Sequence, residues 1–205
     1  MNDSNLELAG GLVPKQFLKN GITGTKKLEK KFGLLLSSRK MPERGWKDAE
    51  IEALLLQLGS MDSNNFAVGV GEREGRVHSS LVSKRCFGMA HGMGRSGNLA
   101  GAQPKAAGSS LVVSLAQKLV VQSLQIAGDS EAKCATVMPV ATGMALFMCI
   151  ASLQKDRPLA KHVVWCRCDQ NSAIKAVALA GLRLEVVEMK LVGEALETDL
   201  EAVKV

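Results

Sequence analysis

The residues best suited to chemistry lie in one glycine-rich stretch, residues 91–105, with the sequence HGMGRSGNLAGAQPK. Its glycines let backbone N–H groups turn toward an anion, and Arg95, Ser96, Gln103 and Lys105 stand among them. The planar guanidinium of Arg95 can hold two phosphate oxygens, while Ser96 and Gln103 add neutral hydrogen-bond donors. The composition suits a phosphate-binding loop, and it is equally consistent with a surface loop that has an incidental arginine.

The same stretch contains a GxGxxG pattern at Gly92, Gly94 and Gly97. In dinucleotide-binding domains this pattern follows a strand directly and opens a helix. Here residues 86–90 make a poor strand, and Pro104 prevents a long helix directly afterwards. No Gly-Lys-Ser/Thr follows the glycines either. A dinucleotide oxidoreductase is therefore a minor alternative.

A second candidate site is formed by Thr142 and Gly143, which follow an expected strand and open an expected helix. A helix N-terminus at the carboxyl end of a strand favours an anion. Gln170 follows the next expected strand, beside Asp169, and could face the same cleft. Simple helix capping by Thr142 or Asp169 is the alternative.

A charged run occupies residues 71–76, with the sequence GEREGR. Such a run is usually a solvated turn. Arg73 or Arg76 could nevertheless reach a phosphate, and Glu72 could repel an anionic group.

The elements that must position these groups are predicted from apolar spacing and turn residues. Helices are expected at 26–36, 48–58, within 72–85, from Ser109-Ser110 to about 127, at 142–155, at 172–180 and from 199; strands are expected at 135–140, 162–166 and 184–188. This alternation predicts an α/β fold, with a mainly parallel sheet covered by helices on both faces. We expect three parts: a helical extension (1–58), glycine-rich active-site loops (59–109) and the start of the α/β domain (110–205).

Most of the chain's net positive charge lies near its start. The net charge is +6, and residues 1–40 carry eight basic and three acidic side chains. Phosphate backbone is a natural partner of such a segment, whereas the aromatic content of 3% disfavours base stacking. The segment includes Lys26, Lys27, Lys30 and Lys31, for which a solvated helix face is the alternative.

The five cysteines are odd in number and irregularly spaced, so no disulfide framework is expected. His162, Cys166 and Cys168 do not have the usual spacing of zinc ligands, and no metal site is expected. No apolar run reaches the roughly 18 residues of a membrane span, and the N-terminus does not have the features of a secretory signal. We expect a cytoplasmic protein.

Several strings occur together in a specific order. They are MDSNNF at 61–66, GVGEREGRV at 69–77, HGMGRSG at 91–97, QPKAAGSSL at 103–111, ATGM at 141–144 and DQ at 169–170. From about Pro42 onward, the chain resembles the archaeal and eukaryotic O-phosphoseryl-tRNA(Sec) selenium transferase family.

This resemblance implies a fold type I enzyme that depends on pyridoxal phosphate and works as a homotetramer. The family converts O-phosphoseryl-tRNA(Sec), with selenophosphate, to selenocysteinyl-tRNA(Sec). Residues 1–58 would then serve tetramer formation and tRNA contact.

The resemblance also implies roles for residues of the charged run and of the glycine-rich loop. Arg95, Ser96 and Gln103 match the loop that grips the substrate phosphoryl group. Glu72 matches a glutamate that rejects ligands with a free α-carboxylate.

For the cofactor, Arg73 matches an arginine that contacts pyridoxal phosphate, and Thr142, Gly143 and Gln170 fall where the family lines the cofactor pocket. Two positions depart from the family pattern: Asn171 stands where a lysine is expected, and Cys166 where a proline is expected.

No lysine in the chain matches the family's Schiff-base lysine, so no catalytic residue is assigned. We therefore expect an inactive, incomplete form of the enzyme. A non-catalytic tRNA-binding or assembly module is the alternative.

Overall fold

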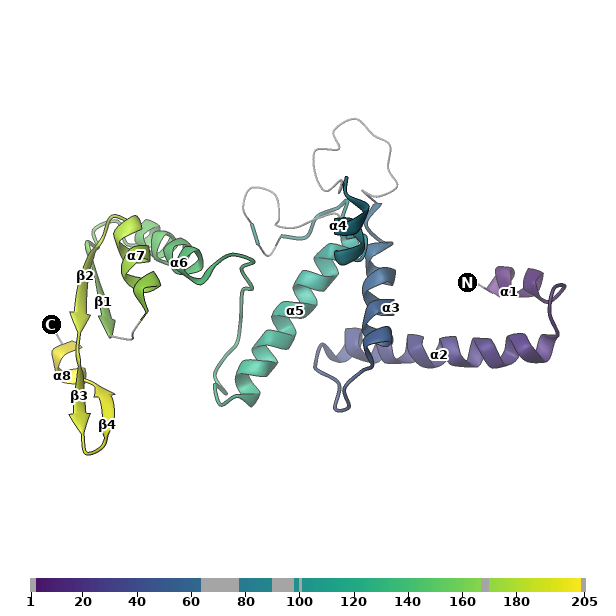
Figure 1. The fold of residues 1–205 in the computed structure, drawn as a ribbon, viewed down its shortest axis with the longest axis horizontal. Helices are drawn as coiled ribbons and strands as arrows, with labels where there is room; N and C mark the ends of the chain where they lie inside the picture. Colours follow the sequence, from purple (N-terminus) through teal and green to yellow (C-terminus); the bar gives the residue numbers. More distant parts are fainter. Residues whose placement is uncertain (1–2, 64–77, 90–97, 100, 167–169, 204–205) are drawn as a thin grey trace. The chain divides into compact units, whose positions relative to one another are not determined.

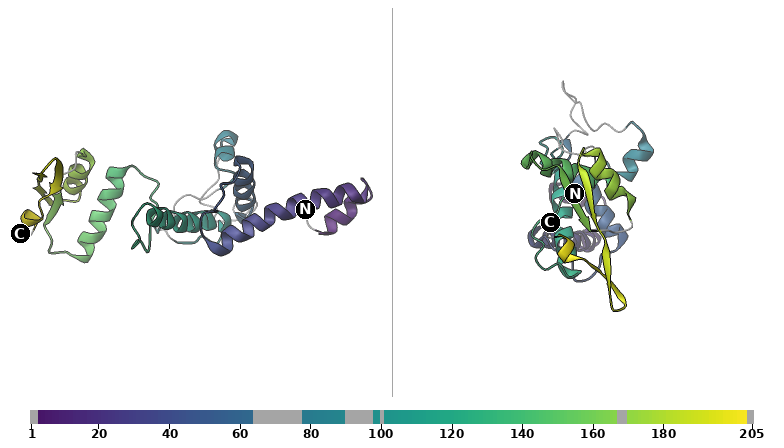
Figure 2. Two further views of the ribbon diagram at one scale, coloured as in Figure 1. Left: turned by 90° about the horizontal axis from the view of Figure 1, so that it is seen from below. Right: turned by 90° about the vertical axis from the view of Figure 1, so that its left-hand side faces the viewer.

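The computed structural model describes residues 3–63, 78–89, 98–99, 101–166 and 170–203. The chain divides into two compact units, Met1–Val137 and Met138–Val205, and each is described by itself. Figures 1 and 2 show that the first unit is built from helices, whereas the described strands all belong to the second.

The first unit contains five described helices: α1 (Asp3–Ala9), α2 (Lys15–Ser38), α3 (Asp48–Gly59), α4 (Ser80–Arg85) and α5 (Ala107–Ile126). Helix α2 ends where Arg39 takes a left-handed conformation with φ of 54° and donates its N–H to the Leu35 carbonyl. Helix α3 begins with Asp48 and Glu50 in its first turn, where acidic side chains complement the helix dipole.

The core of this unit lies where α2, α3 and α5 meet. Its buried residues are Phe32 and Leu35 of α2 and Leu54 and Leu58 of α3. Each pair is three or four residues apart, so both members lie on one helix face. Partly buried side chains of α5 pack against them, namely Val112, Leu115 and Leu119. Figure 1 shows α5 beside α3, and the two helices are in contact.

One backbone contact brings α3 and α5 especially close together. A Cβ atom on Gly108, in the first turn of α5, would lie 1.7 Å from the Leu58 carbonyl oxygen of α3. Gly59 has a similar position, because a Cβ there would lie 2.2 Å from the Phe87 carbonyl oxygen. Because Gly59 and Gly108 have no side chains, α3 can approach both α5 and the segment at Phe87 at these two points.

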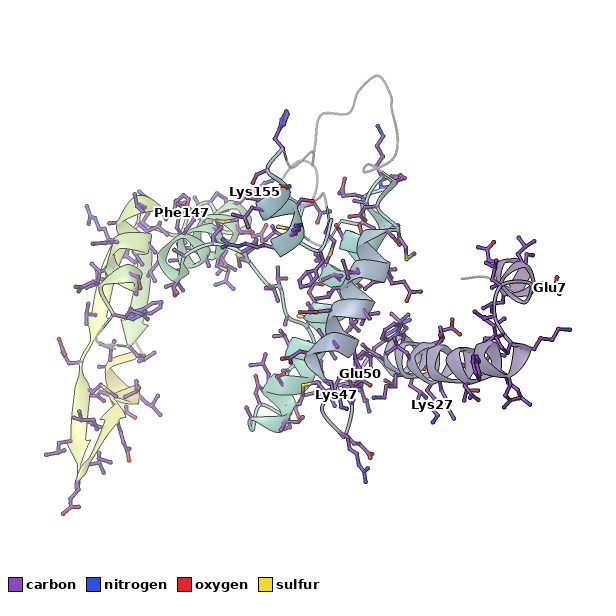
Figure 3. All side chains as sticks on the ribbon, turned by 45° about the vertical axis from the view of Figure 1, so that its right-hand side comes forward. Glu7, Lys27, Lys47, Glu50, Phe147 and Lys155 are labelled. Atoms are coloured by element: carbon purple, nitrogen blue, oxygen red, sulfur yellow. The ribbon has the colours of Figure 1, made fainter. Side chains whose placement is uncertain are left out.

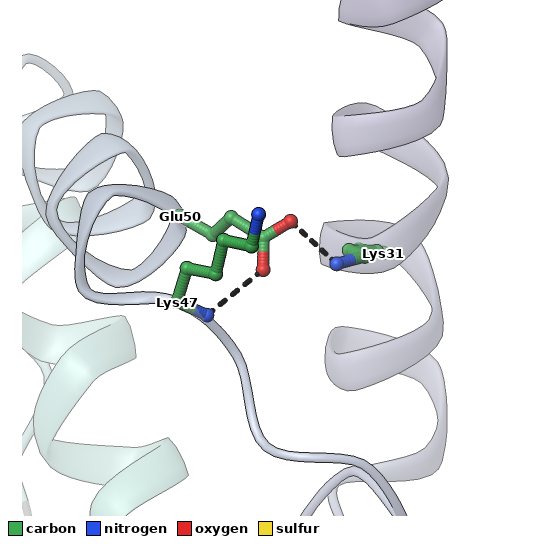
Figure 4. A network of polar contacts seen from close by, with 3 residues as sticks. All are labelled: Lys31, Lys47 and Glu50. Carbon is green, nitrogen blue, oxygen red and sulfur yellow. Dashed lines mark hydrogen bonds and ion pairs between the residues drawn. The ribbon is translucent and has the colours of Figure 1, made fainter.

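A polar contact ties α2 to the start of α3 (Figure 4). Lys31 Nζ lies 2.5 Å from Glu50 Oε1, and the Lys47 backbone N–H donates to Glu50 Oε2 at 3.0 Å. The hydrogen bond from Lys31 is the main cause that lowers the pKa of the Glu50 carboxyl, with help from the Lys47 N–H. Glu50 therefore neutralises Lys31 and caps α3 at the same time.

The second unit contains α6 (Thr142–Asp156), β1 (His162–Cys166), α7 (Asn171–Leu179), β2 (Arg183–Val187), β3 (Met189–Val192), β4 (Ala195–Thr198) and α8 (Leu200–Val203). Strands β1 and β2 are parallel, with Val164 opposite Glu185. Between them, α7 buries Ala173, Ala176 and Val177, and it packs on α6 and β2. This is a β-α-β unit of the kind that builds parallel sheets.

The predicted elements are confirmed at 48–58, 142–155, 162–166, 172–180 and 184–188, each to within one or two residues. The helix expected at 26–36 is part of a longer one, since α2 begins at Lys15. The short helix expected within 72–85 is α4, and the one expected from 199 is α8. Gly128 follows the end of α5 with φ of 116°.

One local prediction is wrong. Residues 135–140 form no strand, and the Val140 N–H instead bonds to the Met138 carbonyl two residues back. The apolar composition of this segment suits a strand. A strand also needs a neighbouring strand to pair with, and this segment forms no such backbone hydrogen bonds. The helix expected from Ser109-Ser110 to about 127 is confirmed as α5, which begins two residues earlier, at Ala107, after the N-cap Ala106.

The β3–β4 hairpin was not predicted. Its two strands pair antiparallel, and the chain reverses at Gly193, with φ of 64°, and Glu194. A two-residue turn containing glycine is a hairpin signal, but the short exposed strands give little alternation of apolar residues.

None of the helices in the described part of the chain is long and apolar enough to cross a membrane. The three-part functional division at 58/59 and 109/110 stays a prediction, since the two compact units are defined by contacts alone.

We predict that Gly108→Ala destabilises the first unit, because its Cβ would meet the Leu58 carbonyl oxygen. Overpacking typically costs about 1–3 kcal/mol, and a contact with backbone atoms should place this variant at the upper end of that range. Gly33→Ala is the matched control: Gly33 lies in α2 with no neighbouring atom within 4 Å, so alanine should stabilise by about 0.5–1 kcal/mol. Urea unfolding followed by circular dichroism measures both. Equal midpoints for the two variants would contradict the contact.

Candidate functional site

The sequence-predicted site residues divide into two groups. Glu72, Arg73, Arg95 and Ser96 lie outside the described residues, as do the glycines of the GxGxxG pattern. The described group consists of Gln103 in the first unit and of Thr142, Gly143 and Gln170 in the second.

Gln103 is held in place by the first turn of α5. Its backbone N–H donates to Ser110 Oγ at 2.8 Å, and its carbonyl accepts the Ala106 N–H at 3.0 Å. Its side-chain Nε2 donates to the Gly101 carbonyl at 3.1 Å. Ser110 Oγ in turn donates to the Ala106 carbonyl. The C-terminal end of the glycine-rich loop is thus a folded turn with a half-buried glutamine.

The end of α3 holds the same turn from the other side. Ser63 Oγ donates to the Lys105 carbonyl at 3.4 Å. The neighbouring Asp62 is fully buried and accepts two hydrogen bonds from Ser109, one from its backbone N–H at 2.9 Å and one from its hydroxyl. Sequence reasoning missed Asp62, because no local pattern pairs residues 47 positions apart.

In the second unit, the N-terminus of α6 is open to an anion. Its N-cap, Ala141, has no side chain that can cap, and no acidic residue lies in the first turn. Thr142 is exposed and is the first helical residue, so it does not serve as the helix cap. The first amides of a helix have no partner within it and carry the positive end of its dipole.

The start of α7 lies against this helix end. A Cβ on Gly143 would lie 3.3 Å from Ser172 Cβ, so the small residue allows the close approach of α6 and α7. Gln170 is the exposed N-cap of α7 and makes no side-chain capping bond. Ser172 Oγ is buried and has no hydrogen-bond partner among the described residues. The structure therefore brings the Thr142–Gly143 and Gln170 segments together.

The four lysines of the predicted basic segment differ in their exposure to solvent. Lys26, Lys27 and Lys30 are exposed on α2, whereas Lys31 is partly buried by its contact with Glu50. Figure 3 shows Lys27 on α2, with Lys47 and Glu50 near the C-terminal end of that helix. Lys26, Lys27 and Lys30 therefore present their charge to solvent, with the exposed Glu29 between them.

A groove of about 780 Å³ adjoins this basic surface, and Lys31 lines part of it. Lys40 and Arg44 line it, together with the hydroxyls of Ser37 and Ser38. Gln122 of α5 closes one side by accepting the Met41 N–H at 2.6 Å. Ser37 Oγ already donates to the Leu34 carbonyl, and the acidic Glu43 and several apolar side chains also line the groove, so its lining is mixed.

The cysteines and histidines that the structure describes form no comparable site. Among the described residues, no three His, Cys, Asp or Glu side chains gather as metal ligands would. Four cysteines are free thiols and exposed, including Cys166 of β1. His162 Nδ1 lies 2.9 Å from Glu185 Oε1 on the neighbouring strand, an exposed cross-strand pair.

Comparison with known proteins gives a consistent result. The sequence model of the O-phosphoseryl-tRNA(Sec) selenium transferase family matches residues 60–205. Relatives of that name include one from Dictyostelium discoideum, 41% identical over all of this chain and 44% of the relative. Another, from Methanopyrus kandleri, is 37% identical over 92% of this chain and 43% of the relative.

A solved structure agrees. The crystal structure of an archaeal O-phosphoseryl-tRNA(Sec) selenium transferase matches 94% of this chain with a TM-score of 0.81 and 32% sequence identity. The match covers 44% of that protein, so this chain spans less than half the length of the relatives it matches. The predicted fold class is confirmed: a helical extension followed by part of a pyridoxal-phosphate-type α/β domain. On these grounds, the chain belongs to the O-phosphoseryl-tRNA(Sec) selenium transferase family.

Proposed function

We propose that these 205 residues supply the phosphate-recognition and tRNA-contacting part of an enzyme that converts O-phosphoseryl-tRNA(Sec) to selenocysteinyl-tRNA(Sec). Selenophosphate is the proposed selenium donor, pyridoxal phosphate the cofactor and the cytoplasm the compartment. One observation carries the proposal: the family match covers a loop whose described end, at Gln103, is fixed by bonds to α5.

In this proposal, Arg95, Ser96 and Gln103 bind the phosphoryl group of the substrate. The guanidinium holds two phosphate oxygens, and the neutral donors fix their orientation. Glu72 excludes amino acids with a free α-carboxylate by charge repulsion. An aminoacyl-tRNA ester carries no such charge, so it is admitted.

The second unit offers residues that fit the cofactor. Thr142 and Gly143 would hold the phosphate of pyridoxal phosphate at the open N-terminus of α6, and Gln170 would contact the cofactor from the start of α7. Arg73 is proposed as a further cofactor contact. When bound, pyridoxal phosphate supplies an electron sink at the amino acid. This chain's residues bind and orient it.

The N-terminal helices are proposed to serve tRNA contact and homotetramer formation. Large apolar side chains stand exposed there, including Leu8 on α1, Leu12 just after it and Phe17 on α2. Apolar groups exposed in this way are typical of surfaces that pack against another chain. The exposed lysines of α2 would meet the tRNA backbone.

No lysine of these residues matches the lysine that anchors the cofactor covalently in the family. We therefore propose that recognition resides in this chain, whereas selenium transfer needs a lysine from outside it. A non-catalytic tRNA-binding module would also bind without turnover. The tests below therefore apply both to that alternative and to the recognition part of an enzyme.

We predict that Arg95→Ala weakens binding of phosphoethanolamine, a phosphomonoester that has no α-carboxylate. A charge-assisted hydrogen bond contributes about 1.5–3 kcal/mol, so loss of the grip should raise the dissociation constant about tenfold to 100-fold. Arg95→Lys should restore only part, since a point charge cannot copy the planar fork. Titration calorimetry measures the three proteins.

The control for this test is Arg157→Ala, at an exposed arginine after α6 that has no proposed role. It should bind like the wild type. An Arg95→Ala variant that binds within threefold of the wild type would show that the loop does not grip phosphate through this arginine.

We also predict that replacing Lys26, Lys27 and Lys30 together with glutamine flattens the salt dependence of tRNA(Sec) binding. Each lost phosphate contact removes about 0.7–0.9 from the slope of log affinity against log salt, so the triple variant should lose about 2. Lys31 is left unchanged because Glu50 already neutralises it.

A triple variant of equal charge loss, at the exposed residues Lys155, Lys161 and Lys175 of the second unit, is the matched control. Filter binding across a salt series compares the two. Equal slopes in the two triple variants would mean that the α2 lysines are only a solvated helix face.

A further inference from the structure

A buried carboxylate, Asp62, has no role in the function proposed above. It follows α3, is 0% exposed, and accepts hydrogen bonds from both the backbone N–H and the hydroxyl of Ser109. Burying a carboxylate is costly unless hydrogen bonds stabilise it. Asp62 therefore holds α5 only in the one position that supplies these donors.

The surroundings leave this pair no freedom to shift. Gly108, next to Ser109, touches the Leu58 carbonyl so closely that no side chain fits, and its Cβ would also lie 3.2 Å from Asp62 Oδ1. Ala106, the N-cap of α5, is 0% exposed. The Asp62 carboxylate thus fixes how the first turn of α5 is rotated and how closely it packs against α3.

The same two segments hold the candidate phosphate loop. Ser110, the residue after Ser109, accepts the Gln103 N–H at 2.8 Å. Ser63, the residue after Asp62, donates to the Lys105 carbonyl at 3.4 Å. The contact between Asp62 and Ser109 therefore lies between two hydrogen bonds to the loop. If it is lost, the partners of Gln103 and Lys105 are no longer held at a fixed separation.

The charge of Asp62 also matters to where an anion can bind. Asp62 already satisfies the Ser109 N–H in the first turn of α5, the position that would otherwise attract a phosphate. A phosphoryl group held by this region must then rely on donors of the preceding loop.

We propose that Asp62 is a positioning residue for phosphate recognition: through Ser109 it fixes the turn that carries Gln103, without touching the ligand. The identity of the ligand rests on the proposed function, whereas the effect on the turn does not.

The test compares Asp62→Asn, Ser109→Ala and the double variant with the wild-type chain. Asn keeps the shape of Asp62 but loses its charge, and Ser109→Ala keeps the backbone donor but loses the hydroxyl. Asp48→Asn is the matched control, because it removes an exposed carboxylate from the first turn of the same helix, α3. Thermal unfolding first identifies the variants that are folded at the assay temperature.

Two readouts are then taken from the folded variants. One is amide hydrogen exchange at Gln103 and Ala106, relative to amides in the middle of α2. The other is the dissociation constant for phosphoethanolamine.

We expect Asp62→Asn to speed exchange at Gln103 selectively and to weaken binding about tenfold. Ser109→Ala should have a smaller effect in the same direction, and the double variant should fall short of the sum because the two groups act as one contact. Asp48→Asn should match the wild type in both readouts.

Unchanged exchange at Gln103 in folded Asp62→Asn would overturn the inference, as would binding within threefold of the wild type. If Asp62→Asn does not fold, Ser109→Ala decides by the same two criteria. If the wild-type chain binds no phosphoethanolamine, the proposed function fails for this chain. The inference is then judged on exchange alone, where selective acceleration at Gln103 supports it.

Discussion

The close approach of α5 to α3 at Gly108 is the constraint on which the first unit depends. Because no side chain separates the helix start from the Leu58 carbonyl, α5 can bury Val112, Leu115 and Leu119 against the residues that α2 and α3 contribute. The same contact fixes where the glycine-rich loop ends. Packing and the proposed recognition site are therefore linked, because a residue that disturbed the helix contact would also displace the turn at Gln103.

The two helix N-termini nearest the candidate sites differ in their electrostatics. At the start of α5 a buried carboxylate already occupies the anion position, and the helix serves to hold a loop. The first turn of α6 has neither an acidic residue nor a side-chain cap. Gly143, in the same turn, allows α7 to approach closely. This difference supports assigning the substrate phosphoryl group to the loop and the cofactor phosphate to the α6 terminus.

Sequence reasoning predicted the elements whose signal is local. Helix α3 has apolar residues at Leu54 and Leu58 on one face, and Gly181, two residues after the end of α7, has φ of 72°. It failed at residues 135–140, because an apolar run does not show whether a strand has a neighbour to pair with. The bond of Asp62 to Ser109 and the pairing of Lys31 with Glu50 depend on residues brought together by folding, so no spacing rule could predict them. The roles of Arg95 and Glu72 came from resemblance to the family and stay predictions.

The central claim is that these residues recognise phosphate groups and tRNA but do not themselves transfer selenium. The most direct measurement incubates the purified 205-residue chain with pyridoxal phosphate, O-phosphoseryl-tRNA(Sec) and selenophosphate, and quantifies selenocysteinyl-tRNA(Sec) against a no-protein control. The account predicts no product above the control. Product formed by this chain alone would contradict it, because one of its own lysines would then have to anchor the cofactor.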